Sequence, residues 1–192
     1  MMSSTASPDT NKPVVLPFAN PLDEFYIQAG MTLPRIEVVP GSSVPQPYQQ
    51  LLVHEGDMTP TLEKFHKSTI HLEVLRRELH HNAYCRQVLL RTADAKKPVE
   101  FGAIKIFLDH FPTGARNDIL SERLPLGTIL ALFKIEHLSR PKAFLKIFSD
   151  AYINQAFGLQ GTHTLYGRRN TLSTLKKEPL AEIFEILPPH HS

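Results

Sequence analysis

Apolar and polar residues alternate with a period of two along several short stretches of the chain. In residues 68–79 (STIHLEVLRREL), Ile70 and Leu72 share one face with further apolar residues, which predicts a β-strand. Residues 83–91 (AYCRQVLLR) and 96–108 (KKPVEFGAIKIFL) are two more strand candidates. The connections between the three stretches are short, and short connections favour hairpins with antiparallel pairing over helical crossovers.

Helical patterns occupy other parts of the chain. Helices are predicted within residues 51–66, 115–124 and 124–133, and residues 140–148 (RPKAFLKIF) form a helix or an amphipathic stretch. After residue 162 the pattern returns to β-type, with a turn at 176–179 (KKEP) and a closing strand at 180–187 (LAEIFEIL). Strands mixed with a few helices, without regular βαβ alternation, predict an α+β fold with an antiparallel sheet.

Proline is concentrated at the N-terminal end. Eight of the 16 prolines lie in the first 50 residues, a composition that opposes helices and ladder hydrogen bonds. We therefore expect a disordered tail at residues 1–20 and an irregular arm at 21–50 that packs on the domain. Residues 51–188 are expected to form the compact domain, and residues 189–192 a short tail.

The charges and the single cysteine exclude several classes of function. The chain has 21 Lys and Arg against 19 Asp and Glu, a net charge of +2, and no basic stripe, so we expect no nucleic-acid partner. Cys85 alone excludes an internal disulfide and a cysteine-based zinc site. The N-terminus does not resemble a secretory signal, and no stretch of about 18 uncharged apolar residues occurs. We expect a cytoplasmic protein without a membrane span.

Charged residues interrupt two otherwise apolar strand patterns. Arg86 shares a predicted face with Tyr84 and Leu90, but apolar residues lie on both faces, so the pattern leaves its direction open. The closing strand carries Glu182 in one phase and Glu185 in the other, and periodicity does not decide which is buried. Charged groups are rarely buried unless something pairs with them. An inward Arg86 therefore requires an anion from the protein or from a ligand.

Two turns are candidate anion sites. Residues 56–60 (GDMTP) and 125–128 (PLGT) place small or turn-forming residues just before a predicted helix. Free N–H groups at a helix start attract carboxylates and phosphates. The chain has no G-x-G-x-x-G, Walker, H-E-x-x-H or G-x-S-x-G motif, which excludes the nucleotide, zinc-protease and serine-hydrolase sites that those motifs build.

Five short blocks occur in an order that resembles the chorismate lyases, over about residues 51–188. The blocks are LLVHEGDMT (51–59), the arginine of YCRQVLL (84–90), PLGTIL (125–130), GRRNTL (167–172) and AEIFEILP (181–188). The resemblance implies a sheet of about six antiparallel strands with helices packed on one face and an enclosed pocket. It also implies conversion of chorismate to 4-hydroxybenzoate and pyruvate, with no metal and no cofactor.

The resemblance assigns roles to residues at both ends of that pocket. Arg86 would bind the ring carboxylate of the substrate, and backbone N–H groups at Met58 and Leu126 would complete that grip. Glu182 would meet the 4-hydroxyl group and assist proton movement, so that Glu182 and Arg86 are the expected catalytic residues.

The same resemblance covers the two arginines of GRRNTL. At least one of Arg168 and Arg169 would help to hold the enolpyruvyl carboxylate. Because chorismate carries two carboxylates, the site needs at least two cationic or N–H anchors, and arginine offers a bidentate geometry.

A second class of function remains open. The effector-sensing domains of some bacterial transcription regulators resemble the lyase fold and bind small molecules without turnover. Those domains normally follow a DNA-binding helix-turn-helix, which the proline-rich first 50 residues do not supply. The first prediction is therefore a monomeric lyase that acts on chorismate, and the alternative is a non-catalytic module that binds an aromatic acid. The sequence does not indicate whether quinone biosynthesis or another pathway uses the product.

Overall fold

One seven-stranded sheet forms the centre of the computed structural model, which describes residues 19–81 and 83–190. Its strand order is β1-β5-β6-β7-β4-β3-β2, and every neighbouring pair is antiparallel. The strands are β1 (Ile36–Val39), β2 (Ile70–His80), β3 (Ala83–Thr92), β4 (Pro98–Phe107), β5 (Leu138–Phe148), β6 (Thr164–Ser173) and β7 (Pro179–Leu187). The predicted α+β fold with a single antiparallel sheet is confirmed, with seven strands where about six were expected.

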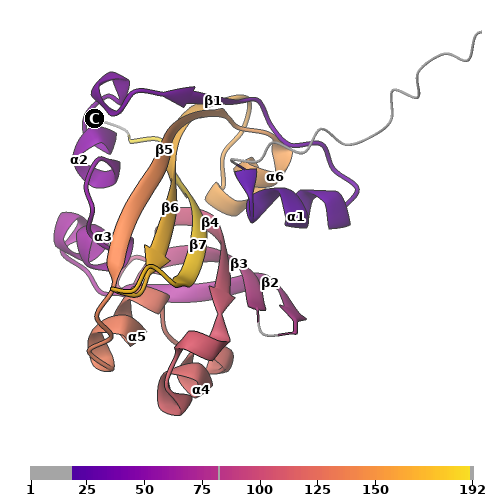
Figure 1. Cartoon of the computed structure of the whole chain (residues 1–192). Coiled ribbons are helices and arrows are strands. Elements are labelled where there is room, and N and C mark those ends of the chain that lie inside the picture. The colour runs from indigo at the N-terminus through magenta and orange to yellow at the C-terminus, as the bar shows by residue number, and fades with distance from the viewer. Residues whose placement is uncertain (1–18, 82, 191–192) are drawn as a thin grey trace, which may run out of the picture.

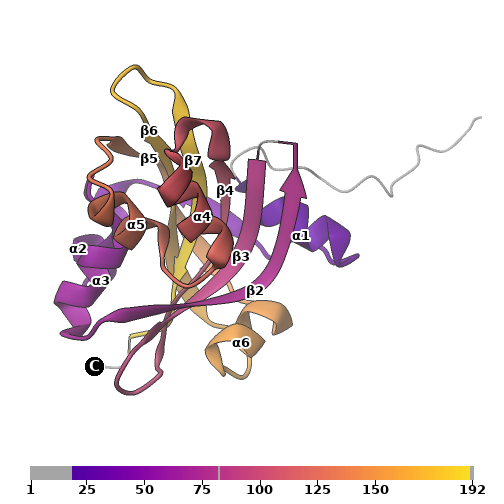
Figure 2. The same cartoon turned by 90° about the horizontal axis from the view of Figure 1, so that it is seen from below.

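Helices pack on both faces of this sheet, which corrects the expectation of helices on one face (Figures 1 and 2). Two short helices cover one face: α1 (Leu22–Gln28) and α6 (Ala151–Phe157). The other face carries α3 (Met58–His66), α4 (Thr113–Ser121) and α5 (Leu126–Leu132). The remaining short elements are α2 (Tyr48–Leu52), η2 (Gly41–Ser43) and η3 (Leu108–His110).

Alternate residues of the central strands build two separate cores. In β3, Cys85 and Leu89 pack against α1 and α6, whereas Tyr84 packs against α4 and α5. In β4, Phe101 belongs to the first core and Ile104 to the second. A strand that is covered on both faces needs apolar residues in both phases. This double burial is the reason that alternation alone did not orient β3.

The segment at residues 21–50 is more regular than the predicted arm. It forms α1, β1, η2 and the start of α2, and α1 packs against the sheet. β1 extends the sheet by pairing with β5, with Ile36 opposite Ile147. Of the predicted tail at residues 1–20, residues 1–18 lie outside the described part of the chain.

The predicted helix or amphipathic stretch at residues 140–148 is wrong, because it is part of β5. Leu145 and Ile147 are fully buried on one face, so the buried positions repeat every two residues, as in a strand. Pro141 lacks an N–H group, and it lies where the pairing between β5 and β6 shifts register. A nine-residue pattern fits a helix as well as a strand. Pairing with β1 on one edge and β6 on the other selects the strand.

Candidate functional site

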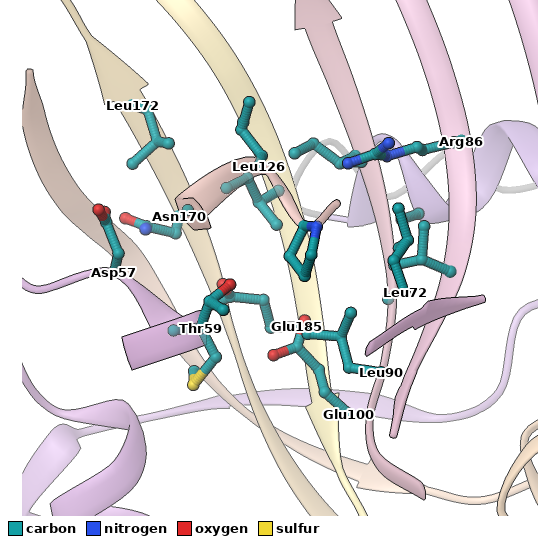
Figure 3. Close-up of a pocket in the computed structure, with 18 residues that line it drawn as sticks. Asp57, Thr59, Leu72, Arg86, Leu90, Glu100, Leu126, Asn170, Leu172 and Glu185 are labelled. Atoms are coloured by element: carbon teal, nitrogen blue, oxygen red, sulfur yellow. The ribbon is translucent and has the colours of Figure 1, made fainter. Parts of the chain in front are cut away.

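A cavity of about 60 Å³ lies between one face of the sheet and the first turns of α3 and α5 (Figure 3). This volume is enough for more than one water molecule. Its apolar walls include Leu72, Val88, Leu90, Ile104, Leu172 and Ile183. Charged side chains lie apart along this apolar space, with Arg86 towards one end and Glu100 and Glu185 away from it (Figure 3).

The starts of two helices close the cavity opposite the sheet. α3 begins at Met58, directly after Asp57, and α5 begins at Leu126. A Cβ atom added at Gly127 would lie 2.9 Å from Oγ1 of Thr59, so a larger residue there would push the two helix starts apart. The predicted site residues Met58 and Leu126 therefore lie close together, and both line the cavity.

Arg86 points into the cavity from β3, which answers the question that the strand pattern left open. The residue is 1% exposed, and its Nε and Nη1 atoms have no hydrogen-bond partner among the described residues. Burial lowers the pKa of Arg86 to about 10, and the neighbouring Tyr84 and Glu122 partly oppose that shift. The guanidinium group thus remains charged at neutral pH and has unused donors inside the protein.

The anionic neighbour of Arg86 is engaged elsewhere. Glu122 accepts a hydrogen bond from the hydroxyl of Tyr84 and forms an ion pair with Arg77 at 2.6 Å. Within the described residues, no ion pair joins Glu122 to Arg86. A buried cation is costly unless it is paired and hydrogen-bonded. Tyr84 and Glu122 favour the charged form of Arg86 only in part, and its Nε and Nη1 donors have no acceptor in the part of the chain that the structure describes.

In the closing strand β7, Glu185 faces the cavity and Glu182 does not, which is the opposite of the prediction. Glu185 is 3% exposed, lines the cavity and lies opposite Gly102 of β4. Glu182 lies opposite Lys105, on the face covered by α1 and α6, and pairs with Nη2 of Arg169 at 3.5 Å. The prediction that Glu182 faces the pocket is therefore wrong, because pairing with β4 and β6 fixes the phase that periodicity left undecided. Arg169 is outside the cavity for the same reason.

Arg168 lies beside Glu185 but does not line the cavity. Its Nε atom donates to the Glu185 carboxylate. Its Nη1 atom donates to the carbonyl oxygens of Leu52 at 3.4 Å and His54 at 3.0 Å, and Nη2 donates to that of Gly56 at 3.1 Å. Arg168 thus ties β6 and β7 to the α2–α3 connection. This set of partners leaves it poorly placed for the expected role at a ligand carboxylate.

Glu100 is a cavity residue that no sequence pattern singled out. It lies on β4, is 4% exposed, and has an Oε2 atom without a hydrogen-bond partner in the described residues. Burial raises the pKa of Glu100 well above its ordinary value, Glu185 raises it further, and Arg168 opposes both. The available signal was its position between Val99 and Phe101, in a strand that is apolar in both phases.

An ion pair borders the cavity at the start of α3. Nε2 of His137 lies 3.0 Å from each carboxylate oxygen of Asp57, and its Nδ1 lies 2.8 Å from the carbonyl oxygen of Ile135. The hydrogen bond to Asp57 raises the pKa of His137, although burial opposes this. The pair ties the first turn of α3 to the connection between α5 and β5.

Two other kinds of feature do not occur in residues 19–81 and 83–190. No group of three or more His, Cys, Asp or Glu side chains is placed to hold a metal ion. No helix there has the length and apolar content that crossing a bilayer requires.

No family model and no curated protein matches the chain. Solved structures do. The effector domain of PhnF from Mycobacterium smegmatis superposes with a TM-score of 0.53 at 9% identity, over 73% of this chain and 98% of that one. A structure of PhnF from the same organism superposes with a TM-score of 0.52 at 7% identity, over 86% of this chain and 92% of that one. The ligand-binding domain of a GntR-family transcriptional regulator from Bordetella bronchiseptica superposes with a TM-score of 0.49 at 12% identity, over 65% of this chain and 88% of that one.

At such low identities, structural similarity establishes the fold alone. The two PhnF structures carry that conclusion: the chain shares the fold of the PhnF effector domain, an α+β fold of the chorismate lyase-like type. These structures are regulator domains and not chorismate lyases.

Proposed function

We propose that the cavity binds a small aromatic carboxylic acid, with the carboxylate of the ligand paired to Arg86. The observation that carries this proposal is the guanidinium group of Arg86, which is buried, charged and without partners on two of its nitrogen atoms. A ligand carboxylate would supply both the missing charge and the missing acceptors. The apolar walls suit a flat ring between the sheet and the helices.

The balance of charges in the cavity favours a ligand with one carboxylate. Arg86 is the sole Lys, Arg or His among the described lining residues, which also include Asp57, Glu100 and Glu185. A second ligand carboxylate would have only backbone N–H groups at the helix starts as anchors. The protein would therefore be a binding module for a monocarboxylate such as 4-hydroxybenzoate. The GntR-type domains that share its fold support a ligand-binding role.

Chorismate lyase activity is the second candidate. Arg86, Met58 and Leu126 line one cavity, which is the arrangement that the resemblance implies. In this reaction the C3–O bond of chorismate breaks, the C4 hydrogen leaves as a proton, and the departing enol of pyruvate takes up a proton while the ring becomes aromatic. Glu185 or Glu100, and not Glu182, would be the carboxyl group that handles protons.

One pair of measurements separates the two candidates. Titration calorimetry with 4-hydroxybenzoate tests binding, and incubation with chorismate tests turnover, with pyruvate and 4-hydroxybenzoate followed together. Binding without turnover is the expected result. Stoichiometric release of both products, unchanged by a chelator, would establish the lyase instead. If neither 4-hydroxybenzoate nor chorismate binds the protein, both candidate functions are overturned.

A further inference from the structure

The carboxyl groups of Glu100 and Glu185 lie next to each other in the cavity. Arg168 is the cation beside them, and it pairs with Glu185. Glu185 pairs across the sheet with Gly102, and Glu100 lies two residues before Gly102 on β4. Residues two apart in a strand share a face, so the two side chains are diagonal neighbours across β4 and β7. Figure 3 shows both of them in the cavity, away from Arg86.

The cation between β6 and β7 is committed to only one of these groups. Arg168 donates to the carboxylate of Glu185 and to three backbone carbonyl oxygens, and no hydrogen bond joins it to Glu100 in the described residues. The other charged and titratable groups around the cavity are Asp57 at the start of α3 with its partner His137, Arg86 on β3, and His54 beside Arg168. None of them forms an ion pair with Glu100.

An ionised Glu100 would be a second buried anion beside one that is already neutralised. Two neighbouring carboxyl groups that cannot both ionise hold one proton between them, and burial favours the neutral form further. Glu185 has the cationic partner, so the proton belongs on Glu100. A protonated carboxyl group has one O–H donor, and the Oε2 atom of Glu100 has no hydrogen-bond partner within residues 19–81 and 83–190.

We infer that Glu100 is a neutral carboxylic acid that donates a hydrogen bond to a ligand oxygen at the end of the cavity away from Arg86. This inference rests on the proposed function and narrows the ligand class. The ligand would be an aromatic acid with an uncharged oxygen, such as a hydroxyl group, at the far side of its ring from the carboxylate. A second carboxylate at that position would meet Glu185 and is excluded by charge.

The first test needs no ligand. Free energies of unfolding of the wild type and Glu100→Gln are measured by urea denaturation between pH 5 and pH 8. Glutamate in an unfolded chain ionises near pH 4.3, below the whole of this range, whereas the folded protein keeps the proton on Glu100. The unfolded state therefore binds fewer protons, and wild-type stability falls relative to Glu100→Gln as the pH rises.

Glu182→Gln is the matched control, because Glu182 lies on the other face of the sheet and outside the cavity. Its stability should follow the wild type across the whole pH range. If the wild type and Glu100→Gln also give parallel curves, Glu100 is ionised in the folded protein and the inference fails. This outcome is independent of which ligand the cavity binds.

The second test compares 4-hydroxybenzoate with benzoate, which lacks the ring oxygen, by calorimetry at pH 7. Wild type and Glu100→Gln should both prefer 4-hydroxybenzoate by about tenfold, because the amide keeps an N–H donor at that position. Glu100→Ala should bind the two acids equally. An unchanged preference in Glu100→Ala would show that Glu100 does not contact the ring oxygen. If neither acid binds the wild type, the proposed function fails, whatever the first test shows.

Discussion

Arg86 on β3 and Arg168 on β6 are both at most 1% exposed in one sheet, with β7 and β4 between their strands, yet their surroundings differ completely. Arg168 donates to the Glu185 carboxylate and to three carbonyl oxygens of the α2–α3 connection. Arg86 has two nitrogen atoms without any partner in the described residues, and it lines a cavity.

This difference separates a structural cation from the proposed ligand-binding cation. A buried charge with a full set of partners is costly to disrupt, since removal of one partner strands the other. A buried charge with unused donors is itself a cost to the folded protein, which a ligand would relieve. Burial alone thus does not distinguish the two arginines. They are distinguished by how many of their N–H donors have no acceptor.

The largest expected effect is on the structural arginine. Arg168→Ala should destabilise the fold by about 3–5 kcal/mol, because it leaves Glu185 as an unpaired buried anion. Urea denaturation checks the value. Arg91→Ala is the control, since its ion pair with Glu73 is partly exposed and should contribute about 0.2–1 kcal/mol. Equal losses in the two variants would remove the contrast between Arg168 and a surface arginine.

Arg86→Ala should have the reverse profile. Calorimetric affinity for 4-hydroxybenzoate should fall by about 2–5 kcal/mol, because a desolvated charge pair is lost. Stability without ligand should fall much less than in Arg168→Ala. Arg86→Met fills the space with apolar atoms and should be at least as stable as the wild type. A variant at Arg86 that binds 4-hydroxybenzoate normally would contradict the assignment of Arg86 as the anchor.

The two glutamates of the closing strand give a third contrast. Glu185→Gln should destabilise the fold by about 1–3 kcal/mol, because Arg168 then faces a neutral partner in a buried place. Glu182→Gln should change stability by less than about 1 kcal/mol, since its ion pair is partly exposed. If chorismate is turned over, Glu185→Gln should also slow turnover more than Glu182→Gln does. The opposite ranking would mean that the strand phase described for β7 is wrong.

The smallest expected effect concerns Asp57 and His137 at the edge of the cavity. Because the folded-state pKa of His137 is raised, its pairing stabilises the protein fully below about pH 6.5, the unfolded value, and is lost as the pH rises through the folded value. Asp57→Asn keeps a residue that caps helices well. The wild type should exceed this variant by about 0.2–1 kcal/mol at pH 5.5, and the gap should narrow by pH 8.5. A gap that stays constant with pH would show that the effect does not depend on the charge of His137.

Several features of the site were accessible from the sequence. Arg86 was recognised as a charge in an apolar strand, and the turns before Met58 and Leu126 were recognised as helix starts beside a possible anion site. These are local signals, because they depend on residue type and on neighbours within one turn or strand. All three residues line the cavity. Glu100 carries the same kind of signal as Arg86, a charge in a strand that is apolar in both phases, but it was not singled out from the sequence.

The sequence by itself determined the class of fold, the positions of most strands and the presence of charged groups in apolar surroundings. Only the tertiary structure decided which of those charges are satisfied. Strand phase in β7 depends on its pairing with β4 and β6, and the carbonyl oxygens that Arg168 contacts belong to residues more than a hundred positions away. Period-two alternation is equally consistent with Glu182 or Glu185 inside. Buried charges are satisfied by partners brought together through long-range pairing, and a local pattern contains no information on that pairing.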